Sequence, residues 1–243
     1  MAAKIQQRNE LVNRQCAELA ESLKLRGYRS CVLKGQGVAA LYKFRDENLE
    51  LIDLSALRQS GDIDVYVDCG RAKAIEFARS IQDEVDWDYK HLHLDIFTDT
   101  EVELHYVPEV LLNLRKNKKL QKWFKDHQDM IFTKQGELVS PSVEFNACYI
   151  LLHIYRHFLY EGVGLRQLID YYFVLRAANK EGFKVSGGQE FQELLRTFGI
   201  MRFVRGVMWI IAHVFANVNA NVTLTFSLGL SRMRRRVNTS STR

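Results

Sequence analysis

The chain has 243 residues and a mass of 28.3 kDa, enough for one large domain or two small ones with a sizeable core. Apolar residues make up 47% and charged residues 26%, which excludes disordered, collagen-like and low-complexity classes. The formal net charge is +5, but five of the 34 basic residues, and no acidic residue, follow Ser231. The rest therefore carries 29 basic and 29 acidic residues, so a pI of about 9.0 is poor evidence for a nucleic-acid partner.

The four cysteines are far apart and form no C-x-x-C pair, which predicts buried free thiols in a reducing compartment. The N-terminal residues are too polar for a secretory signal. The most apolar stretch, Val207 to Val218, falls short of the roughly 20 residues that a membrane span needs. We therefore expect a soluble, cytoplasmic protein that does not contact a membrane.

The first 110 residues alternate between strand and helix patterns. In chain order they predict a helix over 5–26, a strand over 29–33, a glycine turn leading into a short helix over 35–42, a polar loop over 44–60, a strand over 62–67, a helix over 71–84 and a hairpin over 91–97 and 102–106.

After Pro108 the pattern becomes entirely helical. The predicted helices cover 120–130, 142–161, 165–179, 189–198 and 201–217. The expected organisation is an α+β domain with a mixed sheet over 1–110 and a helical domain over 111–220. An atypical basic tail follows over 221–243, with disorder as one interpretation.

The segment from Gly61 to Val67 carries the most chemical information. Side chains alternate along a strand, so Ile63, Val65 and Val67 face the core while Asp62 and Asp64 share the other face. Two neighbouring carboxylates repel each other, and aspartate is a poor strand former. A divalent cation would offset this repulsion directly.

The strand over 102–106 repeats the arrangement, with Glu103 and His105 on one face. If it lies beside the first strand, Glu103 joins Asp62 and Asp64. Three hard oxygen ligands favour Mg²⁺ or Mn²⁺, which suits two-metal phosphoryl or nucleotidyl transfer. The alternative is an exposed sheet face with unrelated acids.

A glycine turn, Lys34-Gly35-Gln36-Gly37, leaves the first strand and enters a helix. Backbone N–H groups at such a turn bind anions, glycine lets a phosphate approach closely, and Lys34 adds a cation. The turn is not a Walker A sequence, so on its own it is weak evidence.

Together, "CVLKGQGVAALY", "RQSGDIDVYV" and "VELHYVP" resemble the nucleotidyltransferase superfamily that includes DNA polymerase β. More narrowly, the chain is similar to an uncharacterised bacterial nucleotidyltransferase family with a C-terminal helical region. This resemblance includes "LLHIYRHFLYEGVGLRQLIDYYFVL" and covers most of residues 30–215. It implies a nucleotidyltransferase-like mixed sheet with flanking helices, followed by a helical domain.

The resemblance also implies roles for individual residues. Asp62, Asp64 and Glu103 would be catalytic and bind the metal ions, Glu103 helping to hold the ion that activates the acceptor hydroxyl. The glycine turn would hold the triphosphate. Arg58 and Ser60 form an R-x-S element that resembles an element of toxin-like relatives. The implied nucleotide-binding set is Lys34, Gly35, Gln36, Gly37, Arg58 and Ser60.

Other polar residues have two interpretations each. His93 and His105 either contact substrate or lie on the sheet surface, and Arg166 and Asp170 either touch the nucleotide or form an intrahelical ion pair. His153 and His157 are interpreted as packing histidines because their helix is apolar. A basic run after the hairpin is interpreted as a solvated helix face, with an acidic acceptor as the alternative. The run consists of Arg115, Lys116, Lys118, Lys119, Lys122 and Lys125.

The predicted function is metal-dependent transfer of a nucleoside monophosphate from an NTP to a hydroxyl acceptor, with release of pyrophosphate. The acceptor is unidentified: a small molecule, RNA or protein. One alternative is a toxin that modifies tRNA or protein, and another is a catalytically silent nucleotide-binding or scaffold protein. A D-x-D glycosyltransferase would need a larger domain before the motif.

Overall fold

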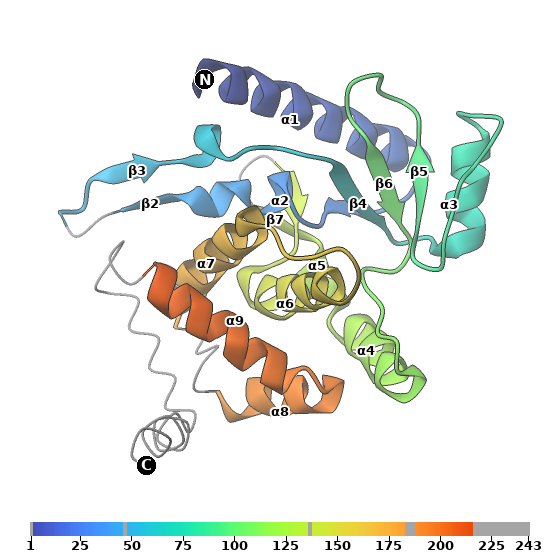
Figure 1. The fold of residues 1–243 in the computed structure, drawn as a ribbon. Helices are drawn as coiled ribbons and strands as arrows, with labels where there is room; N and C mark the ends of the chain where they lie inside the picture. Colours follow the sequence, from blue (N-terminus) through green and yellow to red (C-terminus); the bar gives the residue numbers. More distant parts are fainter. Residues whose placement is uncertain (1, 46–47, 136–137, 183–187, 216–243) are drawn as a thin grey trace, which may run out of the picture.

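We analysed a computed structural model, which describes residues 2–45, 48–135, 138–182 and 188–215. A four-stranded sheet lies between helices on its two sides (Figure 1). The predicted tail over 221–243 lies outside the described residues. The described fold is α+β with a small mixed sheet, flanking helices and a helical C-terminal region, which confirms the predicted fold class.

The sheet has the strand order β1-β4-β6-β5. Its central pair, β4 and β6, is parallel, and the two outer pairings are antiparallel, so the predicted mixed sheet and the β5–β6 hairpin are confirmed. In the parallel register Asp64 lies opposite Glu103. The strand bounds are β1 Ser30–Val32, β4 Ile63–Val67, β5 His91–Leu94 and β6 Val102–His105.

The buried strand residues on one face of the sheet are all apolar. Helices α1 (Ala2–Leu25) and α3 (Gly70–Arg79) cover it, with α1 running along one side of the molecule in Figure 1. Alternation along the strands sends every second side chain to this core, as predicted for β4. The buried strand residues on this face are Val32, Ile63, Val65, Val67, Leu92, Leu94, Val102 and Leu104.

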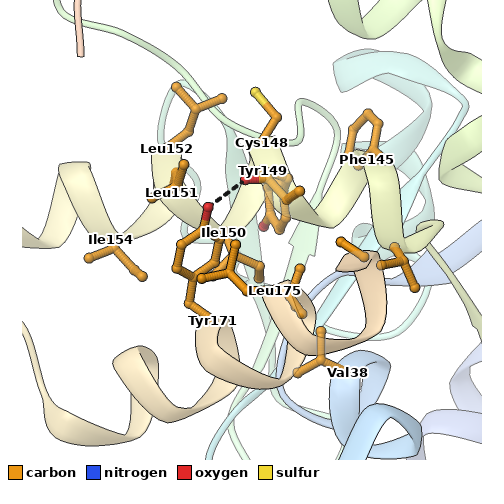
Figure 2. Close-up of a cluster of buried hydrophobic side chains, with 14 of the residues drawn as sticks. Val38, Phe145, Cys148, Tyr149, Ile150, Leu151, Leu152, Ile154, Tyr171 and Leu175 are labelled. Atoms are coloured by element: carbon orange, nitrogen blue, oxygen red, sulfur yellow. Dashed lines mark hydrogen bonds between the residues drawn. The ribbon is translucent and has the colours of Figure 1, made fainter. Parts of the chain in front are cut away.

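Helices α6 (Val143–Tyr160) and α7 (Leu165–Lys180) form the core that lies against the opposite face. Ser142 caps α6 by accepting a hydrogen bond from the Phe145 amide, so the helix starts within a residue of the predicted position. The Tyr171 hydroxyl donates to the Ala147 carbonyl oxygen at 3.2 Å, which ties α7 to α6 (Figure 2).

This second core contains residues from both sides of residue 110, including Cys31 and Tyr66 from the sheet. As a result all five residues of β4 are buried, although only alternate ones were expected to face a core. Asp64 is 1% exposed. The acids of this face therefore do not stand on an open sheet surface, and the division at residue 110 stays a prediction.

The remaining helices lie in the C-terminal half. Asn113 caps the first of them, α4, by accepting from the Lys116 amide, so this helix begins six residues before the predicted start at Leu120. None of the helices in the described ranges is both long and apolar enough to cross a membrane. Their bounds are α4 Leu114–Asp126, α5 Gln128–Ile131, α8 Gln189–Phe198 and α9 Met201–Val214.

The predicted loop over 44–60 is wrong in part, because it contains most of a small hairpin. Strands β2 (Lys43–Arg45) and β3 (Leu51–Asp53) pair antiparallel, and the Lys43 ammonium lies 3.1 Å from an Asp53 carboxylate oxygen. Phe44 packs against Phe173 of α7. Three-residue strands show too little alternation to be recognised, and this pair depends on a helix far away in the chain.

A second hairpin and the connections around the glycine turn complete the described elements. Here too the strands are three residues long. The bounds are β7 Thr133–Gln135, β8 Leu138–Ser140, the short helix α2 Gln36–Ala39 and the 3₁₀ helices Ala40–Tyr42 and Ser55–Leu57.

Candidate active site

Three acidic side chains converge on the second face of the sheet, as the strand patterns predicted. Asp62 directly precedes β4, Asp64 is its second residue, and Glu103 lies opposite on β6. Each offers a carboxylate oxygen, and these oxygens lie within 4.8 Å of one another. We call these three residues the acid cluster.

Lys34, at the end of the first strand, neutralises part of this charge. Its ammonium nitrogen lies 2.9 Å from Asp64 Oδ1 and 3.6 Å from Asp62 Oδ2. Burial alone would lower the pKa of Lys34, but the acid cluster outweighs burial and raises this pKa above its usual value. The mutual repulsion of Asp64 and Asp62, with burial, raises the pKa of Asp62, so the site keeps an excess of negative charge.

His105 joins the acid cluster from β6. Its Nε2 lies 3.1 Å from both Asp64 Oδ1 and Glu103 Oε2. Burial would raise the pKa of both carboxyl groups. For Asp64 the charge of Lys34 and then the His105 hydrogen bond outweigh burial, and for Glu103 the His105 hydrogen bond and then Lys34 do so, so both pKa values are lowered.

The other predicted histidine of the sheet is placed differently. His93 Nδ1 lies 3.4 Å from the exposed Glu101 rather than beside Asp64. His91, on the same strand, lies nearer: its Nδ1 is 3.6 Å from Glu103 Oε2. Burial lowers the pKa of His91 to about 4. His91 and His93 are two residues apart, so strand alternation puts them on one face. Alternation does not tell which of them lies nearer the acid cluster, because that depends on how each side chain is oriented.

The glycine turn brings Lys34 and Gly35 to the acid cluster, whereas the next two residues, Gln36 and Gly37, do not line the cavity beside it. Gly35 has a φ of +61°, and a side chain at Gly37 would collide with the Val32 carbonyl oxygen, so both positions need glycine. The Gln36 amide group donates to Asn13 of α1 at 2.6 Å. The Gln36 side chain therefore stabilises the turn by linking it to α1.

Arg58 and Asp170, predicted separately, bind each other. Arg58 donates from Nε to Asp170 Oδ1 at 2.8 Å and from a terminal nitrogen to Oδ2 at 2.7 Å. The Tyr42 hydroxyl donates to the same Asp170 oxygen at 2.5 Å. Both charged side chains are buried. This pair fixes α7 to the segment before β4, and it replaces the intrahelical Arg166–Asp170 pair that was the alternative interpretation. No sequence pattern pointed to Tyr42.

A cavity of about 80 Å³ opens between the acid cluster and helices α6 and α7. Arg166 lines it, is exposed, and forms no ion pair among the residues that the structure describes. Its guanidinium lies against the backbone of Gly61, where an added Cβ would come within 2.9 Å. Ser60 is nearby, and its hydroxyl oxygen is buried without a hydrogen-bond partner. Besides Arg58, which is paired with Asp170, two cations, Lys34 and Arg166, thus flank the cavity.

His153 and His157 also line this cavity. They pack against each other with ring centroids 4.4 Å apart, in line with their interpretation as packing histidines. His153 Nδ1 lies 3.6 Å from the buried Glu109, and burial holds the pKa of His153 well below its usual value. His157 Nδ1 lies 2.8 Å from Glu161. The helical spacing predicted that His153 and His157 share one side of their helix. The structure shows that this side faces the cavity.

A larger cavity of about 640 Å³, lined mainly by apolar side chains, lies between α4 and α6. None of the predicted site residues lines it. The chemistry-bearing groups gather at the smaller cavity, where carboxylate oxygens can hold a hard cation and two basic side chains can neutralise phosphates.

The comparisons with known proteins agree with this geometry. Neither the curated proteins nor the solved structures contain a significant match. A family model described as "Uncharacterised nucleotidyltransferase" matches residues 1–216, which includes every predicted site residue. The chain therefore belongs to this uncharacterised nucleotidyltransferase family.

Proposed function

We propose that this protein transfers a nucleoside monophosphate from an NTP to a hydroxyl acceptor, using a divalent cation, and releases pyrophosphate. One observation carries the proposal: the carboxylates of Asp62, Asp64 and Glu103 converge beside a cavity flanked by two cations. Membership of a nucleotidyltransferase family supports the reaction class.

The donor set of the acid cluster fits Mg²⁺ or Mn²⁺. All three ligands are hard carboxylate oxygens, and the raised pKa of Asp62 reflects negative charge that Lys34 does not fully balance. When bound, the divalent cation would neutralise phosphate charge and lower the pKa of the attacking hydroxyl.

Lys34 and Arg166 would bind the phosphates. Lys34 forms its contacts with Asp62 and Asp64, and its ammonium could turn from these carboxylates to a phosphate when they hold the divalent cation. Arg166 has no ionic partner within the described part of the chain, and its planar guanidinium suits phosphate oxygens. The Gly35 backbone would allow the phosphate to approach closely.

Arg58 and Asp170 would act as positioning residues. Their mutual hydrogen bonds occupy Asp170, so neither is assigned a direct contact with the reacting atoms. The cavity is smaller than the roughly 300 Å³ typical of ligand pockets. The nucleoside would therefore extend beyond it, and the phosphate end would occupy the space next to Lys34 and Arg166.

The test is incubation of the full chain with Mg²⁺ or Mn²⁺, each α-labelled NTP in turn, and a cell extract. Transfer of label to a small molecule, RNA or protein is expected and would identify the acceptor class. Asp64→Asn should abolish it, whereas Asp68→Asn, at the other end of β4 and paired with Arg29, should not. Nucleotide binding without transfer under any of these conditions would contradict the proposal and favour a silent binding protein.

A further inference from the structure

A second group of potential metal ligands lies beside the acid cluster and has different chemistry. His91, Glu103 and His105 each offer one ligand atom, and the three atoms lie within 4.8 Å of one another. Two imidazoles and one carboxylate are the donors that Zn²⁺ prefers, whereas Mg²⁺ prefers oxygen alone. We propose that His91, His105 and Glu103 form a Zn²⁺ site. The proposal rests on this geometry and not on nucleotidyl transfer.

The spacing of the donor atoms fits a zinc ion. Bonds of 2.0–2.2 Å in a tetrahedron put neighbouring ligand atoms about 3.4 Å apart. Glu103 Oε2 lies 3.6 Å from His91 Nδ1 and 3.1 Å from His105 Nε2. Both distances are within a few tenths of an ångström of that value, and the two histidine nitrogens lie within 4.8 Å of each other.

The hydrogen-bond state of His91 supports the same conclusion. This side chain is 94% buried, and its Nδ1 points toward Glu103 without a hydrogen-bond partner. On the other side of the ring, Nε2 lies 3.9 Å from Asp88, whose other oxygen accepts the amides of Lys90 and His91. A carboxylate held behind a histidine is the usual way to orient a metal-binding imidazole.

His105 would bind the ion through Nε2, the ring nitrogen that faces the carboxylates. Its Nδ1 is buried without a hydrogen-bond partner whichever nitrogen carries the proton. Nε2 lies between two carboxylates, Asp64 and Glu103, and a zinc ion bound to Nε2 would take the place of a proton at this nitrogen. Because three protein ligands leave one position of a tetrahedron open, water or another ligand would complete the coordination.

The test is isothermal titration of the metal-free full chain with Zn²⁺. We expect tight binding of one ion, and His91→Gln should weaken it at least tenfold. His93→Gln is the matched control, because His93 lies on the same strand but is grouped with Glu101 and Glu103 rather than with His91 and His105. It should change the affinity less than twofold, and thermal unfolding would verify that both variants fold.

Anomalous diffraction from Zn²⁺-soaked crystals of the unaltered chain provides a second measurement that needs no variant. A peak bounded by His91, Glu103 and His105 is the expected result. A peak at His93 and Glu101, a loss of affinity in His93→Gln but not in His91→Gln, or the absence of a Zn²⁺ peak would each overturn the proposal. None of these results depends on whether the chain transfers nucleotides.

Discussion

The two faces of the four-stranded sheet differ in composition although the same strands build both. On one face Ile63, Val65 and Val67 pack against α1 and α3 in a purely apolar core. On the other, Asp64, Glu103 and His105 are buried or half-buried next to α6 and α7. Burying apolar surface stabilises the fold, whereas burying like charges costs free energy. We therefore expect the first face to contribute mainly to stability and the second to carry the proposed chemistry.

The largest expected effect is on the polar face. Asp64→Asn removes a carboxylate from the centre of the acid cluster, and we expect nucleotidyl transfer to fall at least about 1,000-fold because the cation loses a ligand. Unfolding should stay cooperative. The label-transfer assay measures the loss, with Asp68→Asn as control. If Asp64→Asn kept a tenth of the activity, the acid cluster would not be required for transfer.

The buried ion pair of Arg58 and Asp170, near the polar face, is expected to have a structural role. Asp170→Ala leaves the buried Arg58 guanidinium without its partner, and we expect a loss of about 4 kcal/mol in the free energy of unfolding. Urea denaturation measures it. The double variant Arg58→Met/Asp170→Leu should recover most of the loss, since it removes both buried charges. A loss below about 1 kcal/mol would show that the pair does not hold α7 in place.

Neighbouring residues of β6 allow the two faces to be compared directly. Leu104→Ala creates a cavity in the apolar core and should cost about 3 kcal/mol of unfolding free energy. Glu103→Gln, on the adjacent residue, should cost much less stability but abolish transfer. Equal destabilisation by the two variants, measured in the same urea titration, would contradict the assignment of stability to one face.

The smallest effect concerns pH. Burial lowers the pKa of His153 in the folded chain, so below about pH 6.5 the unfolded chain binds the extra proton first and stability falls as pH falls. Between pH 6.5 and pH 5, His153→Gln should reduce this slope by roughly 1 kcal/mol per pH unit. His213→Gln, at an exposed position, should leave it unchanged. The measurement is a series of urea titrations at several pH values. An unaltered slope in His153→Gln would refute the prediction.

Much of the fold follows from local patterns. Alternation identified β4 and β6, and helical periodicity identified the helices after Pro141, because these elements bury one face of a regular repeat. The hairpin of β2 and β3 escaped prediction. Its three-residue strands are stabilised by contacts with α7, including Arg176 over the ring of Phe44, and such contacts leave no local signal.

The candidate site was predictable to a similar extent. The spacing of Asp62, Asp64 and Glu103 is enough to bring them together once β4 and β6 are parallel neighbours. The partner of Arg58 was not predictable, because Asp170 is 112 residues away in the chain. The position of Gln36 could not be read either, since its contact with Asn13 depends on how α1 crosses the turn.

The ammonium of Lys34 between Asp64 and Asp62 has a consequence for how the protein matures. Because the chain supplies an internal counterion to its own carboxylates, folding would not require the divalent cation proposed at the acid cluster. The chain should therefore stay folded when this cation is removed, unlike zinc fingers, which unfold without their ion. The divalent cation proposed for this site would then bind to a chain that is already folded.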